Sequence, residues 1–267
     1  IINNRFAKIF SGVGRFPIEP VSIVLSDDAE PVQQPARRVP VALKEKFKKE
    51  LKSMEKVGII TKLDRNTPTP WLHSYVIVRK PNGSLRICLD PTELNKYIIR
   101  PVCNARTLDD VSHKLKDAKF FSVFDGTKCF FHLPLDKKSK MLTAMLTPEG
   151  VYIFNVLAMG LSNSGDLCES ALRELLSDLS GVTNIADDIL VYGSTQQEHD
   201  ENVIRFLERC LEIDLHLNPD KVKLNCKSVP FFGMTLTDQG IKPDPRKVEA
   251  IHNWPMPTCV KEVQSFL

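Results

Sequence analysis

The sequence predicts an α+β protein. Helical and strand-like segments follow one another without the regular alternation expected of a doubly wound parallel sheet. Turns that contain glycine, proline or asparagine join several pairs of strand-like runs, as they do in antiparallel hairpins. The chain has 267 residues, 42% of them hydrophobic, which suffices for one large domain or two small ones with a buried core.

Charge and cysteine content narrow the functional class. The 36 basic and 33 acidic residues leave a net charge of +3, which is weak support for a polyanionic partner. The seven cysteines are scattered without a CxxC pair, so they indicate neither a zinc ribbon nor a disulfide framework. We therefore expect a reduced, intracellular setting. The sequence has no apolar run long enough to span a bilayer and no signal peptide.

The N-terminal third predicts an arm, a helix and a hairpin. Five prolines mark residues 1–40 as an extended arm, with a short strand at Val21–Leu25. Residues 41–58 predict a helix, because one stripe is apolar (Leu43, Phe47, Leu51, Met54) and Gly58 follows as a stop. We interpret the lysines on its opposite face as solvated, in preference to a phosphate contact. Residues 71–90 predict a hairpin around Pro81-Asn82-Gly83.

The rest of the chain continues the mixed order. A helix is predicted at 106–119, a strand at 120–125, and further strands at 129–136 and within 139–156. The C-terminal part predicts helices at 164–181 and 199–215, hairpins at 184–193 and 228–241, and helices that begin at 244 and 258. In the helix at 164–181, we expect Leu167, Ala171 and Leu175 to lie on one face. The chain starts at Ile1 and stops at Leu267 within a helical pattern, so we expect it to be part of something longer.

Two adjacent acids stand between two apolar runs in "NIADDILVYG". Successive strand side chains point to opposite faces, so Asp187 and Asp188 can serve one site only if the chain turns there. The apolar strand "FFSVFD" ends on Asp125, and if the two strands lie side by side, three carboxylates converge. Such a cluster favours protonation unless a divalent cation is present. Two Mg²⁺ ions about 3.5–4 Å apart can stabilise the attacking and leaving oxygens of a phosphoryl transfer.

The acid pair alone has a plainer interpretation. An Asp-Asp pair is more often a solvated turn or a helix N-cap. The apolar flanks and the matching Asp125 favour the metal hypothesis. The acids by themselves do not name a substrate.

A longer series of motifs indicates a substrate class through its resemblance to a known family. In order from about Arg37 to the end stand "RRVPVALKEK", "MEKVGIITK", "VRKPNGSLRICLDPTELNK", "FFSVFDGTKCFFHLPLD", "MGLSNS", "IADDILVYGSTQQEHDENV", "LNPDKVKL", "FFGMTLTDQGIKPDPRKVEAI" and "KEVQSFL". Together they resemble the reverse transcriptase domain of gypsy-type long-terminal-repeat retrotransposon Pol polyproteins. The resemblance implies a right-hand polymerase fold, with an N-terminal arm at 1–40, fingers and palm at 41–236, and only the start of a thumb at 237–267.

The resemblance also implies roles for individual residues. Asp125, Asp187 and Asp188 would be catalytic and would hold two Mg²⁺ ions, or Mn²⁺ in their place. The expected nucleotide-binding residues are Lys80, Arg86, Gly126, Thr127, Phe130, Met159 and Gly160. Gly126 and Thr127 would contribute backbone N–H groups, and Phe130 would exclude a ribose 2′-OH. The expected primer grip is Phe232, Gly233 and Met234, while Asp90 and Asn95 are interpreted as structural.

The implied reaction is RNA-directed DNA synthesis, in which a primer 3′-OH attacks the α-phosphate of a deoxynucleoside triphosphate. The implied partners are an RNA or DNA template–primer and deoxynucleotides, with ribonuclease H and integrase regions downstream in a full polyprotein and no membrane. The implied location is a cytoplasmic retroelement particle or the nucleus.

Some residues depart from the family pattern. Ile185 replaces a tyrosine, Ala158-Met159 replaces Pro-Phe, and Ser164-Gly165 replaces Ala-Pro. Some gypsy-type relatives share the change at Ile185. The altered loop "LAMGLSNSG" and the short thumb favour an alternative, a catalytically decayed domain that retains only nucleic-acid or protein binding. A two-metal nuclease or cyclase on a similar palm is a third hypothesis, and the motif "NGSLRICLDPTELNK" counts against it.

Overall fold

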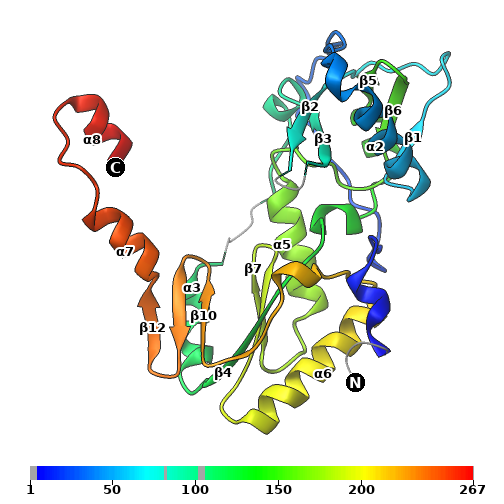
Figure 1. The fold of residues 1–267 in the computed structure, drawn as a ribbon. Coiled ribbons are helices and arrows are strands. Elements are labelled where there is room, and N and C mark those ends of the chain that lie inside the picture. The colour runs from blue at the N-terminus through cyan, green and yellow to red at the C-terminus, as the bar shows by residue number, and fades with distance from the viewer. Residues whose placement is uncertain (1–4, 81–82, 102–105, 267) are drawn as a thin grey trace.

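The computed structural model describes residues 5–80, 83–101 and 106–266, and Figure 1 shows their arrangement. The α-helices are α2 (Lys44–Lys56), α3 (Leu108–Ser112), α4 (Lys137–Leu142), α5 (Ser164–Leu175), α6 (Gln196–Glu212), α7 (Pro245–His252) and α8 (Val260–Phe266). The strands are β1 (Ile60–Lys62), β2 (Ser74–Arg79), β3 (Leu85–Asp90), β4 (Phe120–Asp125), β5 (Met145–Thr147), β6 (Gly150–Phe154), β7 (Val182–Ile185), β8 (Asp188–Gly193), β9 (Lys223–Cys226), β10 (Ser228–Phe231), β11 (Met234–Thr237) and β12 (Gly240–Pro243). Short 3₁₀ segments are η1 (Ala7–Phe10), η2 (Val41–Leu43), η3 (Leu94–Lys96), η4 (His113–Leu115), η5 (Cys129–His132) and η6 (Pro219–Lys221).

A four-stranded sheet in the order β7-β8-β4-β9 organises the region with the predicted acids. Successive side chains along each strand point to opposite faces of this sheet. Phe124, Ile189 and Val191 join the core that contains α5 and α6. Phe121 and Val123 face the other way, into a second core. The sheet is therefore covered on both faces, which explains why its strands read as nearly continuous apolar runs.

The second core is built by elements that precede β4 in the sequence and by elements that follow it. The sheet β10-β11-β12 is antiparallel throughout, and Val229, Phe231 and Leu236 from it pack against the four-stranded sheet. Leu108 and Val111 of α3 complete this cluster. The hairpin predicted at 228–241 is confirmed, and β12 adds a third strand that the sequence analysis missed.

A separate lobe carries the helix and hairpin predicted near the N-terminus. It contains α2, the hairpin β2-β3 and the sheet β1-β6-β5 (Figure 1). Phe47, Leu51 and Met54 of α2 are buried as predicted, and its lysines are exposed. The hairpin at 71–90 is confirmed in β2 and β3, but Pro81 and Asn82 of its expected turn lie outside the described residues.

The N-terminal arm is part of the core and not a free linker. Phe6, Ile9, Phe16 and Ile23 are buried in the main cluster. The strand expected at Val21–Leu25 is replaced by isolated bridges, from Val21 to Leu135 and from Leu25 to Ile98. The apolar residues of this segment find partners across the molecule without a continuous ladder.

One further expectation is wrong, and one helix was missed. The strand expected at 129–136 begins as η5, and residues 137–142 form α4 with Asp136 as its N-cap. In α5 the expected Leu167, Ala171 and Leu175 are partly buried and pack against the main core, while the buried residues are Ser164, Cys168, Glu169 and Leu172. Apolar content alone did not distinguish a short helical turn from a strand, because four positions are too few to separate a period of 3.6 from a period of 2.

A disulfide also corrects the sequence analysis. Cys129 and Cys168 are bonded to each other, although the scattered cysteines predicted none. The bond joins η5 to α5, two segments that are 39 residues apart in sequence. Within the described part of the chain, no helix has the length and apolar character that crossing a bilayer requires. The helices α7 and α8 extend away from the sheets (Figure 1).

Candidate active site

Two of the predicted acids lie side by side at one end of the four-stranded sheet. Strands β4 and β8 pair antiparallel along their whole length, and Asp125 is the register partner of Asp188. Both side chains share the sheet face of Phe121 and Leu190, because positions two apart on a strand point the same way. Asp125 is 8% exposed, and Asp188 is half-buried.

The third acid lies in the turn between β7 and β8. Asp187 follows Ala186, which has a φ of +52°. An alanine in the left-handed region is uncommon and costs free energy, so the surrounding contacts must hold it there. The backbone oxygen of Asp187 accepts a hydrogen bond from the Gly126 N–H at 3.3 Å, which ties this turn to the end of β4.

Electrostatics confirms that the three carboxylates lie close together. Burial raises the pKa of Asp188 above its ordinary value, and the charges of Asp187 and Asp125 raise it further. Lys221 donates a hydrogen bond from Nζ to Asp125 Oδ2 at 2.7 Å. This contact raises the pKa of Lys221. The charges of Lys221 and Lys223 therefore offset part of the negative charge of the cluster.

The donor set suits a hard divalent cation, but it is not preassembled. Carboxylate oxygens are the ligands that Mg²⁺ prefers, and the raised pKa of Asp188 marks charge that a cation would relieve. Among the described residues, no three acidic, histidine or cysteine side chains stand in the arrangement of a ready metal site. Lys221 contacts only one oxygen of Asp125 in the described part of the chain, so a cation could bind through the other oxygen.

A group of cations lies near the β2-β3 hairpin. Lys80 follows β2, and Arg86 lies on β3 opposite Val78. Burial lowers the pKa of Lys128, and the nearby charges of Lys80 and Arg86 lower it further. Lys128 has a φ of +53° and stands between Asp125 and η5. The structure therefore adds Lys128 to the two cations predicted from sequence.

The predicted backbone donors already have partners. The Gly126 N–H donates to Asp187, and the Thr127 N–H donates to the backbone oxygen of His216 at 2.8 Å. Contact with a phosphate would require these bonds to be exchanged. Phe130 lies in η5 and is partly buried against the core, beside the disulfide cysteine Cys129.

Asn95, between β3 and α3, holds the loop of Met159 and Gly160 through hydrogen bonds. Asn95 donates from Nδ2 to the Gly160 oxygen at 2.9 Å and accepts at Oδ1 from the Ser162 N–H at 2.9 Å. Gly160 has a φ of +113°, and a Cβ there would lie 2.5 Å from the Leu89 oxygen. The structural role expected of Asn95 is confirmed. Asp90 likewise forms a salt bridge with Arg37 of the arm.

The predicted primer grip forms the tip of a separate hairpin. Phe232 and Gly233 join β10 to β11 with φ values of +45° and +77°. Positive φ at both central positions is the geometry of a tight hairpin turn. Phe232 is 50% exposed, and Met234 pairs with Phe231. The tip is therefore presented to solvent.

Sequence reasoning missed Lys221 and Lys128. Lys221 is 96 residues from Asp125, so no local pattern links the two. The one available signal was its place in the motif "LNPDKVKL", which follows the acid hairpin. Lys128 follows Gly126-Thr127 directly, and its burial is not visible in the local sequence.

The chain resembles polyproteins and polymerases of retroelements. The Retrovirus-related Pol polyprotein from transposon 297 of Drosophila melanogaster is 29% identical over 208 residues, covering 76% of this chain and 19% of the polyprotein. The polyprotein from transposon gypsy of the same organism is 26% identical over 249 residues, covering 90% of this chain and 24% of the polyprotein. This chain thus spans about a fifth to a quarter of these relatives.

A solved structure shares the fold. The foamy viral protease-reverse transcriptase in complex with double-stranded DNA matches with a TM-score of 0.86 over 99% of this chain and 47% of that chain, at 23% identity. The family model for reverse transcriptase (RNA-dependent DNA polymerase) matches residues 78–236, which is more than half of the chain and contains all three aspartates. The chain therefore belongs to the reverse transcriptase family.

Proposed function

We propose that this chain is the polymerase part of a retroelement Pol polyprotein and catalyses RNA-directed DNA synthesis. The observation that carries the proposal is the antiparallel pairing that sets Asp125 beside Asp188, with Asp187 in the adjoining turn. In this reaction a primer 3′-OH attacks the α-phosphate of a deoxynucleoside triphosphate, and pyrophosphate leaves. The template is RNA or DNA.

The three aspartates would hold two divalent cations, Mg²⁺ or Mn²⁺, with Asp125 and Asp187 as shared ligands and Asp188 in support. Such ions stabilise the attacking and leaving oxygens when they are bound. Until then, Lys221 balances part of the charge of the cluster.

Other residues would position the substrates. Lys80, Arg86 and Lys128 form a positive surface suited to a triphosphate, since charge-assisted bonds to phosphate are short and strong. Phe130 and the loop of Met159 and Gly160 would border the sugar and base of the nucleotide. The hairpin tip of Phe232, Gly233 and Met234 would hold the primer end.

The partners and context follow from the same proposal. A template–primer duplex would be bound mainly through its backbone and shape. Ribonuclease H and integrase regions would belong to the remainder of a full polyprotein, and integration of the DNA product would follow synthesis. Residues 41–236 would form the fingers and palm, and residues 237–267 the start of the thumb. The protein would act inside the cell, in a cytoplasmic particle or in the nucleus.

A second candidate is a domain that binds nucleic acid without catalysis. The observation that favours it is the cluster itself, which stands paired with Lys221 and not arranged as a ready metal site among the described residues. The altered loop at Ala158-Met159 points the same way. The two candidates differ in one measurable property, which is turnover.

The test is primer extension on an RNA template with Mg²⁺. It compares the wild-type chain with the Asp187→Asn/Asp188→Asn double variant, which keeps side-chain size but removes charge. The control is Asp27→Asn/Asp28→Asn, a second adjacent acid pair that lies in an exposed turn of the arm. We expect the site variant to lose about 100-fold or more in rate, because the ligands of both cations are weakened. The control should keep the wild-type rate.

Template–primer binding is measured in parallel by fluorescence anisotropy. Binding without any extension by the wild-type chain would reject catalysis and support the second candidate. Equal extension by the wild type and the site variant would reject the assignment of the aspartates.

A further inference from the structure

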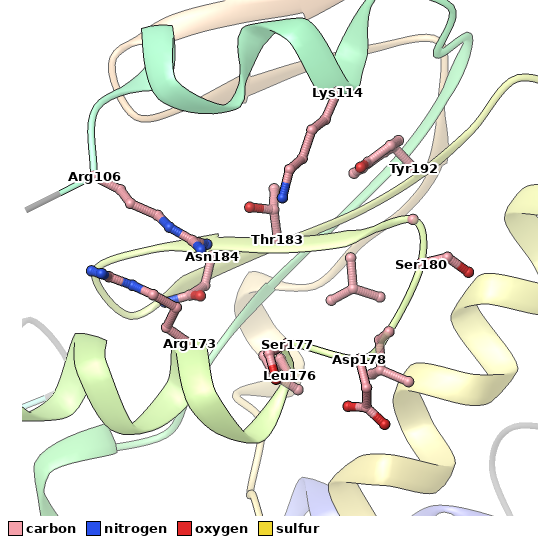
Figure 2. A pocket seen from close by; sticks show the side chains of 13 residues that line it. Arg106, Lys114, Arg173, Leu176, Ser177, Asp178, Ser180, Thr183, Asn184 and Tyr192 are labelled. Carbon is pink, nitrogen blue, oxygen red and sulfur yellow. The ribbon is translucent and has the colours of Figure 1, made fainter.

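A polar cavity, apart from the acid cluster, lies at the free edge of the four-stranded sheet. Its volume is about 460 Å³, within the range of small-ligand pockets. The edge strand β7 lines it, together with residues from the segment around α3 and η4 and from the C-terminal end of α5 (Figure 2). None of the residues predicted from sequence to bind metal, nucleotide or primer lines this cavity.

Three cationic side chains converge on the cavity from different elements. Arg106 precedes α3, Lys114 lies in η4, and Arg173 lies in α5. Figure 2 shows Lys114 reaching from its helix toward Thr183 of β7, while Arg106 and Arg173 approach Asn184 from opposite sides. Like charges brought together in this way create a positive potential that favours an anion between them.

The acids of this region are already paired. Asp178 accepts hydrogen bonds from Nη1 and Nη2 of Arg209, each at 2.7 Å. Glu169 forms a salt bridge of 2.8 Å with Arg173. Within the described part of the chain, the other two cations of the cavity form no salt bridge. The charge of Arg106 contributes to the lowered pKa of Asp110, so that carboxylate offsets part of it. Lys114, among the described residues, has no carboxylate in salt-bridge contact.

The edge strand supplies hydrogen-bond donors. The Thr183 side chain is 3% exposed, and its Oγ1 has no hydrogen-bond partner among the described residues. A buried hydroxyl without a partner costs free energy, which an acceptor in the cavity would recover. The Tyr192 N–H donates to the Gly181 oxygen at 2.9 Å. The alternation of antiparallel bonds then directs the backbone N–H groups of Val182 and Asn184 away from β8, toward the free edge.

We propose that this cavity binds a phosphate group, carried by a small phosphorylated molecule or by the backbone of a nucleic-acid strand. Guanidinium groups meet phosphate oxygens with paired hydrogen bonds, and an ammonium group adds a point charge. The hydroxyl of Thr183 and the strand edge supply neutral donors. The lining carboxylate of Asp178 is held by Arg209. The proposed contacts to phosphate use no metal, and the proposal does not rest on the proposed polymerase activity.

The test measures binding to the full chain without divalent cations, in the presence of EDTA, so that the aspartates cannot recruit phosphate through a metal. Pyrophosphate is titrated by calorimetry, and a single-stranded oligoribonucleotide is titrated by fluorescence anisotropy. The site variants are Arg106→Gln/Lys114→Gln and Thr183→Val. The control is Lys116→Gln/Lys119→Gln, which removes two exposed lysines that do not line the cavity.

We expect the double site variant to bind pyrophosphate at least about tenfold more weakly, because two charge-assisted contacts are lost. Thr183→Val should weaken binding severalfold, and the control should stay within about twofold of wild type. If only the oligoribonucleotide loses affinity, the ligand is a strand phosphate, and the salt dependence of its binding should fall by about two in slope. Equal affinity of wild type and the double variant for both probes, or no binding of either probe by wild type, would overturn the proposal.

Discussion

Substitution of Gly160 tests how the lobe that contains the β2-β3 hairpin is joined to the four-stranded sheet. Its φ of +113° lies where side chains are strongly disfavoured, and an added Cβ would lie 2.5 Å from the Leu89 oxygen and 3.1 Å from Pro91 Cδ. The loop cannot easily move away, because Asn95 holds both Gly160 and Ser162. We therefore expect Gly160→Ala to destabilise the fold and to displace the loop that we assign to the nucleotide pocket.

The magnitude follows from two contributions. A residue forced into a disfavoured backbone region costs about 1–3 kcal/mol. Overpacking against backbone atoms that cannot rotate away costs about another 1–3 kcal/mol. The free energy of unfolding should therefore fall by about 2–6 kcal/mol. If the loop shifts instead, it must break the two hydrogen bonds of Asn95, at about 1 kcal/mol each.

The assay is urea unfolding followed by circular dichroism, with Gly165→Ala as the matched control. Gly165 lies exposed in the first turn of α5, and a Cβ there meets no atom within 4 Å. Alanine should leave stability unchanged or raise it by up to about 1 kcal/mol, because alanine is the better helix former. A loss of less than about 1 kcal/mol in Gly160→Ala relative to the control would contradict the close approach to Leu89.

Three further predictions concern titration and redox state. Burial lowers the pKa of His132 to about 4, and the neutral ring accepts a hydrogen bond at Nε2 from the His216 N–H. The free energy of unfolding of wild type should therefore fall by up to about 3 kcal/mol between pH 6.5 and 4. In pH-dependent urea unfolding, His132→Gln should lose less over the same range. The raised pKa of Asp188 means that the folded chain binds a proton more tightly than the unfolded chain, so stability falls as pH rises through that pKa. Without metal, Asp188→Asn should therefore be more stable than wild type at pH 7 and should lose this advantage below the ordinary aspartate pKa of about 3.9; equal stability at both pH values would contradict the clustering of the carboxylates. The Cys129–Cys168 bond closes a loop with a sequence separation of 39, so reduction should lower the free energy of unfolding by about 4 kcal/mol, and Cys168→Ala should make stability insensitive to reductant.

Local patterns were sufficient for most elements and for the acids themselves. The periods of 3.6 and 2 correctly placed α2, α6, β4 and the hairpin β7-β8. Local sequence also required a turn at Asp187, since two neighbouring acids on a straight strand would face opposite sides. The same reasoning failed in η5 and α4, where four to six residues are too few for one period to exclude the other.

The chemistry of the site depended on contacts that no local pattern contains. The sequence by itself determined that one apolar strand ends in an acid and that an acid pair lies at the tip of an apolar hairpin, because side-chain alternation and turn chemistry act over a few neighbouring residues. Only the tertiary structure decided that Asp125 pairs with Asp188 and meets Lys221, and that Cys129 reaches Cys168. These pairs form when packing of the two cores closes long loops, and the same packing buries the groups and shifts their pKa values.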